Sequence, residues 1–361
     1  MLTIIASPGS YIQGPGEITR LYGCCKKLGC KRAYIIIDKF IYDNYKDSVS
    51  SGFEAAGAGF EMSVFGGECS EREIEKHSGA IGECDVVIGI GGGKTLDCAK
   101  AVAYHMQRQT IIVPTAASSD APCSRLSVIY NDDGSFDKYL PLPKNPDIVA
   151  VDTWIIANAP ARFLASGMGD ALATYYEARA CLLSQSQTMA GGKCSQAAIT
   201  LARLCRDTLL SDGKKALLSV KDKCCTPALE KIVEANTYLS GIGFESGGLA
   251  AAHAVHNGLT SLSECHHMLH GEKVTFGVLT QLALENAPDE ELKKIVMFCR
   301  DIGLPTTLSE LGLSNVDDER LMSAAKLACS QEDTMSNMPF EVTADDVLSA
   351  MRLADAFSRS V

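Results

Sequence analysis

Histidines are concentrated in one short segment of the chain. Five of the seven histidines lie between residues 253 and 270: His253, His256, His266, His267 and His270. His253 and His256 are three residues apart, and His266 and His270 are four apart, so each pair can share one face of a helix. Grouped neutral imidazoles are typical ligands of zinc or ferrous iron, so we expect a metal site here. For any single pair, two surface histidines on a helix remain the alternative.

A catalytic divalent metal needs about three protein ligands and one open position, so a carboxylate should complete two histidines. Asp170 is the candidate, because it is the acidic residue in the small, apolar stretch Ser166-Gly167-Met168-Gly169-Asp170-Ala171. The same position also suits an aspartate that caps the N-terminus of a helix. The residues alone leave both interpretations open.

A glycine-rich motif, Gly89-Ile90-Gly91-Gly92-Gly93-Lys94-Thr95, lies between an expected strand and an expected helix. Glycines allow close approach to a ligand, and a helix start offers free N–H groups, so the motif predicts phosphate binding. Its spacing differs from the G-x-x-x-x-G-K-[ST] of ATP-binding loops, and it does not follow the first predicted strand as the usual dinucleotide fingerprint does. Glycines that serve helix packing alone are the alternative.

Asp38 closes the first predicted strand, residues 33–37. A carboxylate in this position can accept hydrogen bonds from ribose hydroxyls and would repel a 2′-phosphate, which favours NAD over NADP. A surface or helix-capping aspartate is the alternative.

The elements that would position these residues alternate in the first half of the chain. Apolar runs at 33–37, 62–65, 85–90, 110–113 and 148–151 predict strands, and segments 40–57, 70–81 and 95–107 have helical length. Continuous apolar strands separated by helices indicate a parallel sheet covered on both faces, a doubly wound α/β domain. The proline-containing segment 139–146 interrupts this pattern.

The second half has no further strand signal. Alanine- and leucine-rich stretches at 161–183, 194–210, 226–242 and 272–285 predict amphipathic helices. We therefore expect an α/β domain over residues 1–157 and an all-α domain over 158–361, consistent with about 150 residues per domain.

Composition excludes several classes of protein. Hydrophobic residues make up 46% and charged residues 21% of the 361 residues, which is typical of a globular chain. With 33 basic and 44 acidic residues the net charge is −11, which disfavours nucleic acid or an anionic membrane as a partner. No signal peptide or membrane span is expected, and the 15 cysteines without a C-x-x-C pair indicate reduced thiols rather than disulfides or a cysteine zinc site. A cytoplasmic location is expected.

Several motifs together resemble the iron-containing (group III) alcohol dehydrogenase superfamily, most closely its glycerol-oxidising branch. They are GIGGGKTLDCAK, PTAASSDAPCSRLSVIY, GMGDALATYYEA, GGLAAAHAVHNGLT, HHMLHGEKVTFG and MPFEVTADDVLSAM. The resemblance covers nearly the whole chain. It implies the dehydroquinate synthase-like fold of that superfamily, with an N-terminal Rossmann-like NAD domain, a C-terminal helical domain and a catalytic metal between them.

The resemblance also implies residue roles. One divalent metal per subunit, zinc in this branch with iron as the alternative, would be held by Asp170, His253 and His270, and His256 would line the site without holding metal. The substrate hydroxyls would meet Asp120. NAD would be bound at its pyrophosphate by Gly92, Gly93, Lys94, Thr95 and Asp97, and flanked at its ribose and nicotinamide by Thr115, Ser118, Ser124, Leu126 and Tyr130. A homo-oligomer, an octamer by resemblance, is implied as well.

The activity expected from the resemblance is reversible, NAD-dependent oxidation of glycerol to dihydroxyacetone. The metal would stabilise the substrate alkoxide while a hydride passes to nicotinamide C4. His256 is only a candidate for the group that receives the proton. The nearest alternative is action on another vicinal diol or a 2-hydroxy acid. A dehydroquinate synthase-like lyase, which handles a phosphorylated acid, should need several cationic side chains beside the metal, whereas the flanking segments offer chiefly Lys273. A non-enzymatic NAD-binding protein fits the full ligand set less well.

Overall fold

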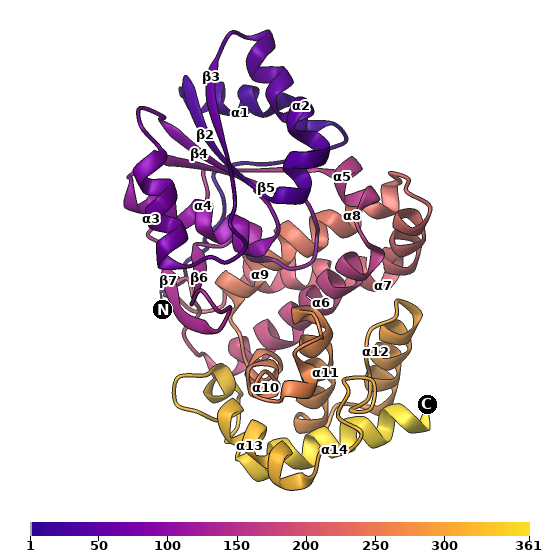
Figure 1. Ribbon diagram of the computed structural model, residues 1–361. Helices are drawn as coiled ribbons and strands as arrows, with labels where there is room; N and C mark the ends of the chain where they lie inside the picture. Colours follow the sequence, from indigo (N-terminus) through magenta and orange to yellow (C-terminus); the bar gives the residue numbers. More distant parts are fainter. Residues whose placement is uncertain (1) are drawn as a thin grey trace.

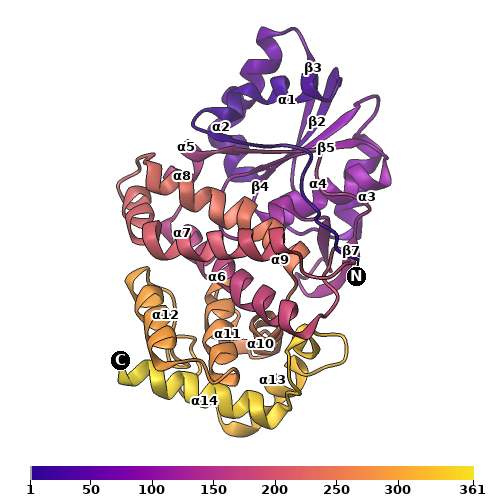
Figure 2. The same ribbon diagram turned by 180° about the vertical axis from the view of Figure 1, so that it is seen from behind.

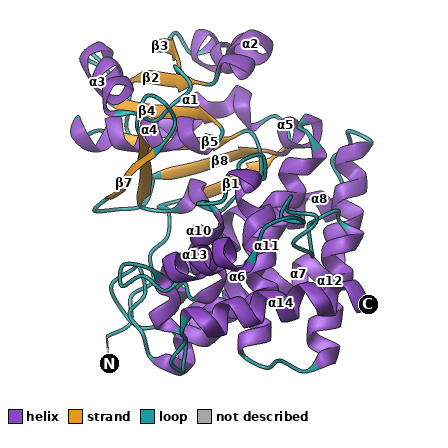
Figure 3. Cartoon of the chain, turned by 60° about the horizontal axis from the view of Figure 1, so that its bottom comes forward, coloured by secondary structure: helices purple, strands orange, loops and turns teal. Residues whose placement is uncertain are grey.

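The computed structural model describes residues 2–361. Within them, every named strand lies between Tyr11 and Asp152, and from Thr153 onward the named elements are helices. Figure 1 and, from behind, Figure 2 show two parts of the molecule. The sheet and the helices that cover it form the upper part, and the helices of the second half form the lower part. Figure 3 shows the same separation, with the strands gathered at one end of the molecule.

The central sheet has six parallel strands. Across the sheet they are β1 (Tyr11–Gly14), β8 (Ile148–Asp152), β5 (Gln109–Pro114), β4 (Val86–Gly91), β2 (Arg32–Ile37) and β3 (Gly59–Val64). The four inner strands are buried along almost their whole length, which explains why they occur in the sequence as continuous apolar runs. The carboxyl ends of β2, β4 and β5 are in register, since Ile37 pairs with Ile90 and Gly91 with Pro114.

Helices cover both faces of this sheet. One face carries η1 (Glu17–Arg20), α1 (Leu21–Lys27) and α2 (Lys39–Ala55), and the other carries α3 (Glu71–Ala80) and α4 (Gly93–His105). Successive side chains of a strand point to opposite faces. Ile35 accordingly belongs to the same apolar cluster as Phe53 of α2, whereas Ile36 belongs to the cluster that contains Ile74 of α3 and Leu96 of α4.

The strand β1 was not predicted from the sequence, and its presence changes the strand order. β1 precedes β2, so Asp38 follows the second strand of the domain, not the first. β1 is short and contains Gln13 and Gly14, so it lacks the apolar run by which the other strands were found. Its parallel pairing with β8, far along the chain, makes it an edge strand.

An antiparallel hairpin formed by β6 (Leu126–Tyr130) and β7 (Phe136–Pro141) follows the short helix η2 (Ala121–Cys123). The predicted break at 139–146 therefore begins inside a strand. β7 is almost entirely exposed and contains the adjacent charged residues Asp137 and Lys138, because the hairpin stands apart from the six-stranded sheet. An exposed strand of this kind gives no apolar run in the sequence.

The second half is built from helices, as predicted. In chain order they are α5 (Thr153–Asn158), α6 (Ala161–Ser184), α7 (Gln196–Lys221), α8 (Pro227–Glu234), the π-helical η3 (Ala235–Leu239), α9 (Ser240–Gly247), α10 (Ala251–Leu259), η4 (Ser263–Cys265), α11 (His270–Leu284), α12 (Asp289–Asp301), α13 (Asp318–Ala328), η5 (Thr334–Asn337) and α14 (Ala344–Ser360). The helix predicted at 226–242 is thus divided into α8, η3 and the start of α9. Isolated bridges join Lys193 to Thr3 and Gln187, so the start of the chain lies against this half.

None of the helices among residues 2–361 is long and apolar enough to cross a membrane. α6 and α11 are instead buried because they pack inside the helical half, where almost every residue of Leu164–Ala178 and Gly271–Leu282 is shielded from solvent. These two helices carry Asp170 and His270.

Candidate metal centre and cofactor site

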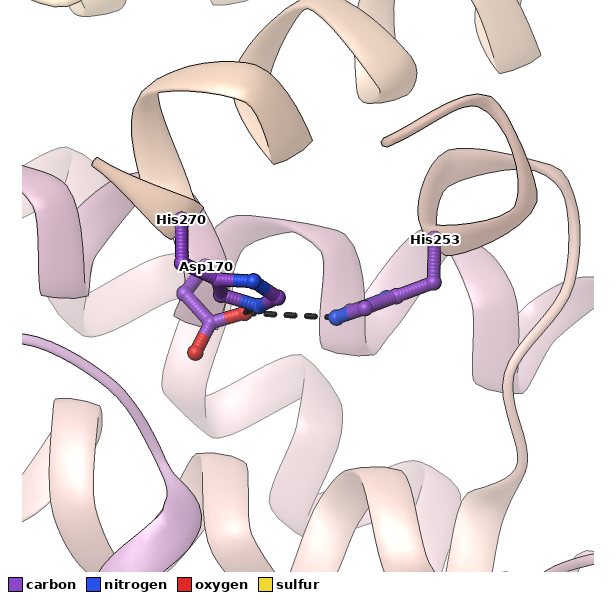
Figure 4. A group of neighbouring side chains, drawn as sticks. All are labelled: Asp170, His253 and His270. Atoms are coloured by element: carbon purple, nitrogen blue, oxygen red, sulfur yellow. Dashed lines mark hydrogen bonds and ion pairs between the residues drawn. The ribbon is translucent and has the colours of Figure 1, made fainter. Parts of the chain in front are cut away.

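The three predicted metal ligands meet in the helical half. Asp170 lies in α6, His253 in α10, and His270 is the first residue of α11. Figure 4 shows the three side chains turned toward one another. Asp170 Oδ1 lies 3.3 Å from His253 Nε2 and 3.2 Å from His270 Nε2. One ligand atom from each residue lies within 4.8 Å of the other two.

Close contact between α6 and α11 makes this meeting possible. A Cβ added to Gly271, next to His270, would lie 1.8 Å from the backbone oxygen of Ser166. A Cβ on Gly169, next to Asp170, would lie 2.4 Å from the backbone oxygen of Gly271. Only glycine at these positions lets the two backbones approach so closely. The glycines of GMGD and HGEK therefore bring the carboxylate and the imidazole together.

His253 is held by a carboxylate that the sequence analysis did not single out. Glu177, seven residues after Asp170 in α6, is fully buried. Its Oε2 lies 2.6 Å from His253 Nδ1, and its Oε1 accepts hydrogen bonds of 2.9 Å from the backbone N–H groups of Ala250 and His253. The signal was a second acidic residue, two helical turns after Asp170, in a stretch otherwise built from small and apolar residues.

Asp170, His253 and His270 are called the triad below. The carboxylate and the two imidazoles stabilise one another's charged forms. Burial by itself would raise the pKa of Asp170, but the imidazoles of His270 and His253 hold that pKa below its ordinary value. Burial disfavours the charged form of His253, yet Glu177 and Asp170 outweigh it and raise the pKa of His253 well above the ordinary range. The site therefore favours a positive charge beside the Asp170 carboxylate, which a metal cation can supply.

The residues present fit a divalent metal ion. Two imidazole nitrogens and one carboxylate oxygen form the donor set of a catalytic zinc site, which keeps a fourth position open for substrate. The His270 side chain is 42% exposed while Asp170 is buried, so the group is accessible from one side. In the described chain no lysine or arginine forms an ion pair with Asp170 or Asp120.

Asp120 lies next to the triad. Its backbone N–H donates a 3.2 Å hydrogen bond to Asp170 Oδ2, and its own Oδ2 accepts one of 2.8 Å from Ser240 Oγ. Burial, with Asp170 nearby, raises the pKa of Asp120 well above its ordinary value. The structure thus brings a second carboxyl group, anchored by α9, to the group of expected metal ligands.

The remaining histidines of the cluster divide into two kinds. The His256 ring packs edge-on against His270, with centroids 4.2 Å apart, and its Nδ1 lies 3.0 Å from Asn257 Oδ1. Burial and the neighbouring imidazoles lower the pKa of His256 well below its ordinary value. His266 and His267 stay outside the group: His266 Nε2 lies 3.1 Å from the backbone oxygen of Thr260, and the His267 ring lies beside Gly312.

The glycine motif joins β4 to α4 at the carboxyl edge of the sheet, where open α/β sheets bind ligands. Gly92 is the N-cap of α4, and no side chain caps this helix. A Cβ on Gly92 or Gly93 would meet nothing within 4 Å, so the helix start is accessible. Gly89, in contrast, is needed for packing, because a Cβ there would lie 2.5 Å from Ala99 Cβ. The motif therefore contains one glycine needed for packing and an open helix start, and its contact with a phosphate stays a prediction.

The other three residues expected at the pyrophosphate differ in their exposure and in the contacts they make. Lys94 is partly exposed; its Nζ pairs with Glu68 at 2.5 Å and lies 4.8 Å from the centre of the Tyr130 ring. Thr95 is buried at the start of α4. Asp97 is buried too, where it pairs with Lys100 at 2.8 Å and accepts a 3.1 Å hydrogen bond from the N–H of Val128. Asp97 thereby holds the hairpin against α4, and its contact with a cofactor stays a prediction.

The segment from β5 to β6 carries the residues expected around the ribose and nicotinamide. The Thr115 N–H donates a 3.1 Å hydrogen bond to Gly91 O, which places Thr115 beside the glycine motif. Buried Lys100 donates to the backbone oxygens of Ala121 and Leu126, at 3.1 and 2.5 Å. Further along this segment lie Ser118, whose backbone oxygen accepts from Ser166, the buried Ser124, and Leu126 and Tyr130 of β6.

Asp38 caps α2. Its Oδ1 accepts hydrogen bonds from the N–H groups of Phe40 and Ile41, at 2.8 and 3.4 Å, so the capping interpretation is correct. The residue also stands at the carboxyl end of β2 beside the glycine motif, since a Cβ on Gly91 would lie 3.0 Å from Asp38 Cβ. This position leaves the predicted contact with a ribose possible, and that contact stays a prediction.

Comparison with known proteins decides the family. A model described as iron-containing alcohol dehydrogenase matches residues 8–153. The chain is 53% identical over 361 residues to glycerol dehydrogenase of Thermotoga maritima, covering 99% of this chain and 98% of that protein. It is 52% identical over 358 residues to glycerol dehydrogenase of Escherichia coli O6:H1, covering 99% and 97%. The chain belongs to the iron-containing alcohol dehydrogenase family.

The fold of this alcohol dehydrogenase agrees with a solved structure of the same family. The crystal structure of glycerol dehydrogenase from Schizosaccharomyces pombe is similar to it with a TM-score of 0.94 and 40% sequence identity, covering 99% of this chain and 92% of that chain. The predicted fold class, a parallel α/β domain followed by a helical one, is therefore confirmed, and so is the prediction that the chain is an oxidoreductase.

Proposed function

We propose that this alcohol dehydrogenase catalyses the reversible, NAD-dependent oxidation of glycerol to dihydroxyacetone. The observation that carries the proposal is the arrangement around Asp170: two histidines lie close to Oδ1, and the backbone N–H of Asp120 donates a hydrogen bond to Oδ2. This arrangement offers a cation site and, directly beside it, a carboxyl group that can bind hydroxyl groups. The names of the similar proteins of Thermotoga maritima and Escherichia coli support glycerol as the substrate.

Each residue of the site has a separate role in the proposed reaction. Asp170, His253 and His270 would hold the divalent ion, which supplies Lewis acidity and so makes deprotonation of the substrate hydroxyl accessible near neutral pH. Asp120 accepts hydrogen bonds from the adjacent hydroxyl groups and orients the polyol. His256, packed against His270, is the candidate for receiving the proton. Orientation of the reacting carbon is the main contribution of the protein.

The cofactor residues of the first half would bind NAD, which supplies the hydride acceptor. The open N-terminus of α4 at Gly92 and Gly93 suits the pyrophosphate. Asp38 at the end of β2 suits the adenosine ribose and disfavours a 2′-phosphate. We place the division between the NAD-binding part and the metal-binding part at residue 157.

A phosphorylated acid, the substrate type of a dehydroquinate synthase-like lyase, fits this site poorly. It would need cationic side chains beside the metal. Arg162, close to His270 in the fold, is paired with Glu272 at 2.6 Å, and Lys273 is buried in α11, where burial lowers its pKa. A 2-hydroxy acid would meet the same shortage of cations, with only the metal ion to balance its carboxylate.

Three further properties belong to the proposal. The metal is zinc, because the donor set of two imidazoles and one carboxylate suits zinc, with iron as the alternative. The protein works in the cytoplasm, since its 15 free cysteines, most of them buried, suit a reducing compartment. It forms a homo-oligomer, an octamer by resemblance, and sedimentation of the purified protein measures its size.

A steady-state survey tests the function. NADH formation is measured for the zinc-loaded protein with glycerol, propane-1,2-diol, several 2-hydroxy acids and no substrate. We expect the highest kcat/KM with glycerol or a close vicinal diol, and loss of turnover in the His270→Ala variant measured in parallel. A higher kcat/KM with a 2-hydroxy acid than with any diol would contradict the proposal.

A further inference from the structure

We propose that Glu177 is the positioning residue of the metal centre: it fixes the His253 ring so that Nε2 carries the lone pair that binds the ion. This inference rests on the proposed metal site at Asp170, His253 and His270. It assigns a function to a buried carboxylate that is neither a ligand of the triad nor a substrate contact.

The geometry of Glu177 leaves it little freedom. The side chain is fully buried in α6, and among the described residues its only charged partner is His253. One oxygen lies 2.6 Å from His253 Nδ1. The other accepts two hydrogen bonds of 2.9 Å, from the N–H groups of Ala250 and His253. A buried carboxylate with three donors arranged around it is well satisfied, as a buried charge must be.

The two backbone contacts fix the start of α10. Ala250 is the N-cap residue of this helix and has no side chain that could cap it. Glu177 supplies the missing acceptor from a different helix, and its negative charge suits the positive end of the α10 dipole. α6 therefore sets both the position of α10 and the direction of its histidine. Asp170, two turns earlier on the same helix, presents its carboxylate to the same ring.

The contact between Glu177 and His253 Nδ1 determines which ring nitrogen of His253 carries the proton. An ionised carboxylate can only accept hydrogen bonds, so Nδ1 must carry the proton. The lone pair of the neutral ring then lies on Nε2, the atom that faces Asp170 Oδ1 at 3.3 Å. Carboxylate partners of this kind orient metal-binding histidines, and their removal typically weakens metal binding about 10- to 100-fold.

Glu177→Gln is the sharpest test, because glutamine keeps the size and removes the pure acceptor. If its amide oxygen faces the two backbone donors, its NH₂ group meets Nδ1, which favours the tautomer with the proton on Nε2. If the amide is turned over, the NH₂ group instead faces two N–H donors. Either orientation disturbs the site. We expect zinc to bind about 10- to 100-fold more weakly, measured by competition with a chromogenic chelator.

A matched control separates positioning from loss of a buried carboxylate. Asp355 in α14 is also buried and accepts a 2.9 Å hydrogen bond from a backbone N–H, that of Leu308, but it lies outside the metal site. Asp355→Asn should leave the zinc dissociation constant unchanged even where it lowers the melting temperature. NAD affinity of the zinc-free protein should be unchanged in both variants. Equal zinc affinity of Glu177→Gln and wild type, or equal losses in the two variants, would overturn the inference.

A measurement on the wild-type protein keeps the inference testable if Glu177→Gln does not fold. In cobalt-substituted protein the imidazole N–H protons of the ligands are paramagnetically shifted and can be followed by proton NMR. We expect the His253 Nδ1 proton to exchange with solvent more slowly than that of His270, because Glu177 holds it in a buried contact. The absence of a slowly exchanging ligand proton would overturn the inference. Wild-type protein that binds no zinc would instead contradict the proposed function itself.

Discussion

Asp120 shows how one residue can be tied to two parts of the site. Its backbone contacts Asp170, and its side chain accepts a hydrogen bond from Ser240. Ser240 in turn lies 2.7 Å from Thr174 Oγ1, so α6 and α9 both support this carboxyl group. Its position is fixed before any substrate binds.

Replacing Asp120 with alanine should therefore affect substrate binding more than metal binding. The backbone N–H that meets Asp170 stays, while the acceptor for substrate hydroxyls is lost. We expect a higher KM for glycerol and a kcat/KM reduced by about 1–3 kcal/mol in free-energy terms, as for deletion of a buried hydrogen-bonding partner. Elemental analysis and NAD titration should give values close to wild type. Kinetics equal to those of wild type would make Asp120 a loop residue only.

Asp38 allows the charge effect to be separated from helix capping. Asparagine caps helices as well as aspartate does, so Asp38→Asn should keep the stability of α2. Two unit charges about 4 Å apart repel by about 1 kcal/mol in water and by more near a protein surface. We expect the kcat/KM ratio of NADP to NAD to rise about tenfold or more.

Asp317→Asn is the matched control for this prediction, because Asp317 caps α13 through the N–H of Arg320, in the helical half. It should leave cofactor preference unchanged. A wild-type enzyme that uses NADP as well as NAD would remove the basis for a role of Asp38.

At the scale of the elements, the crossing of α6 and α11 decides the geometry of the metal centre. Both helices are buried almost throughout, and glycines at the crossing let their backbones come close. The Gly271 N–H also donates a 3.2 Å hydrogen bond to Ser166 Oγ, which links the first turn of α11 to α6. His270 is thus held at the point where the two helices meet.

A methyl group at this crossing should lower the free energy of unfolding. In Gly271→Ala the new Cβ would lie 1.8 Å from Ser166 O, so the helices must separate. We expect a loss of about 1–3 kcal/mol in the free energy of unfolding, together with weaker zinc binding, because His270 moves with the helix. Denaturant titration and chelator competition measure the two effects.

Gly23→Ala in α1 is the comparison, since a Cβ there meets nothing within 4 Å. Alanine in a free helical position should stabilise by about 0.5–1 kcal/mol and leave zinc binding unchanged. Equal effects of the two substitutions would show that the close crossing is not needed for the site.

At the scale of the whole molecule, the two ligands would bind to different halves. The three expected metal ligands lie in α6, α10 and α11, whereas Asp38 and the glycine motif lie at the carboxyl edge of the sheet. The segment after β5 connects the halves: Asn236 Nδ2 donates to Ala117 O and to Leu164 O, at 3.0 and 3.3 Å. We therefore expect that metal and cofactor can be removed independently.

Thermal unfolding with and without each ligand tests this separation. A ligand at a hundredfold excess over its dissociation constant stabilises the folded state by about 2.7 kcal/mol. We expect zinc to raise the melting temperature of wild type but not of His270→Ala, whereas NAD should raise both. Stoichiometric zinc in purified His270→Ala, measured by elemental analysis, would exclude His270 as a ligand.

Much of the architecture follows from the sequence by itself, because it is encoded locally. Buried parallel strands must be continuously apolar, so β2, β4, β5 and β8 could be found from composition and length alone. The glycine motif could be placed between a strand and a helix, because an apolar run precedes it and a segment of helical length follows it. The cluster of histidines predicted a metal site. Only the resemblance to a family selected His253 and His270 among the five histidines of the cluster.

The tertiary structure decided what no local pattern encodes. Asp170 and His270 are 100 residues apart, and they meet because α6 and α11 pack at their glycines. The role of Glu177 depends on a third helix, α10, whose start it caps, so an acidic residue in an apolar stretch could not be interpreted from its own segment. β1 and β7 were missed because an edge strand and an exposed strand bury too little surface to require an apolar run. Contacts between distant segments, and the burial they produce, are properties of the packed molecule.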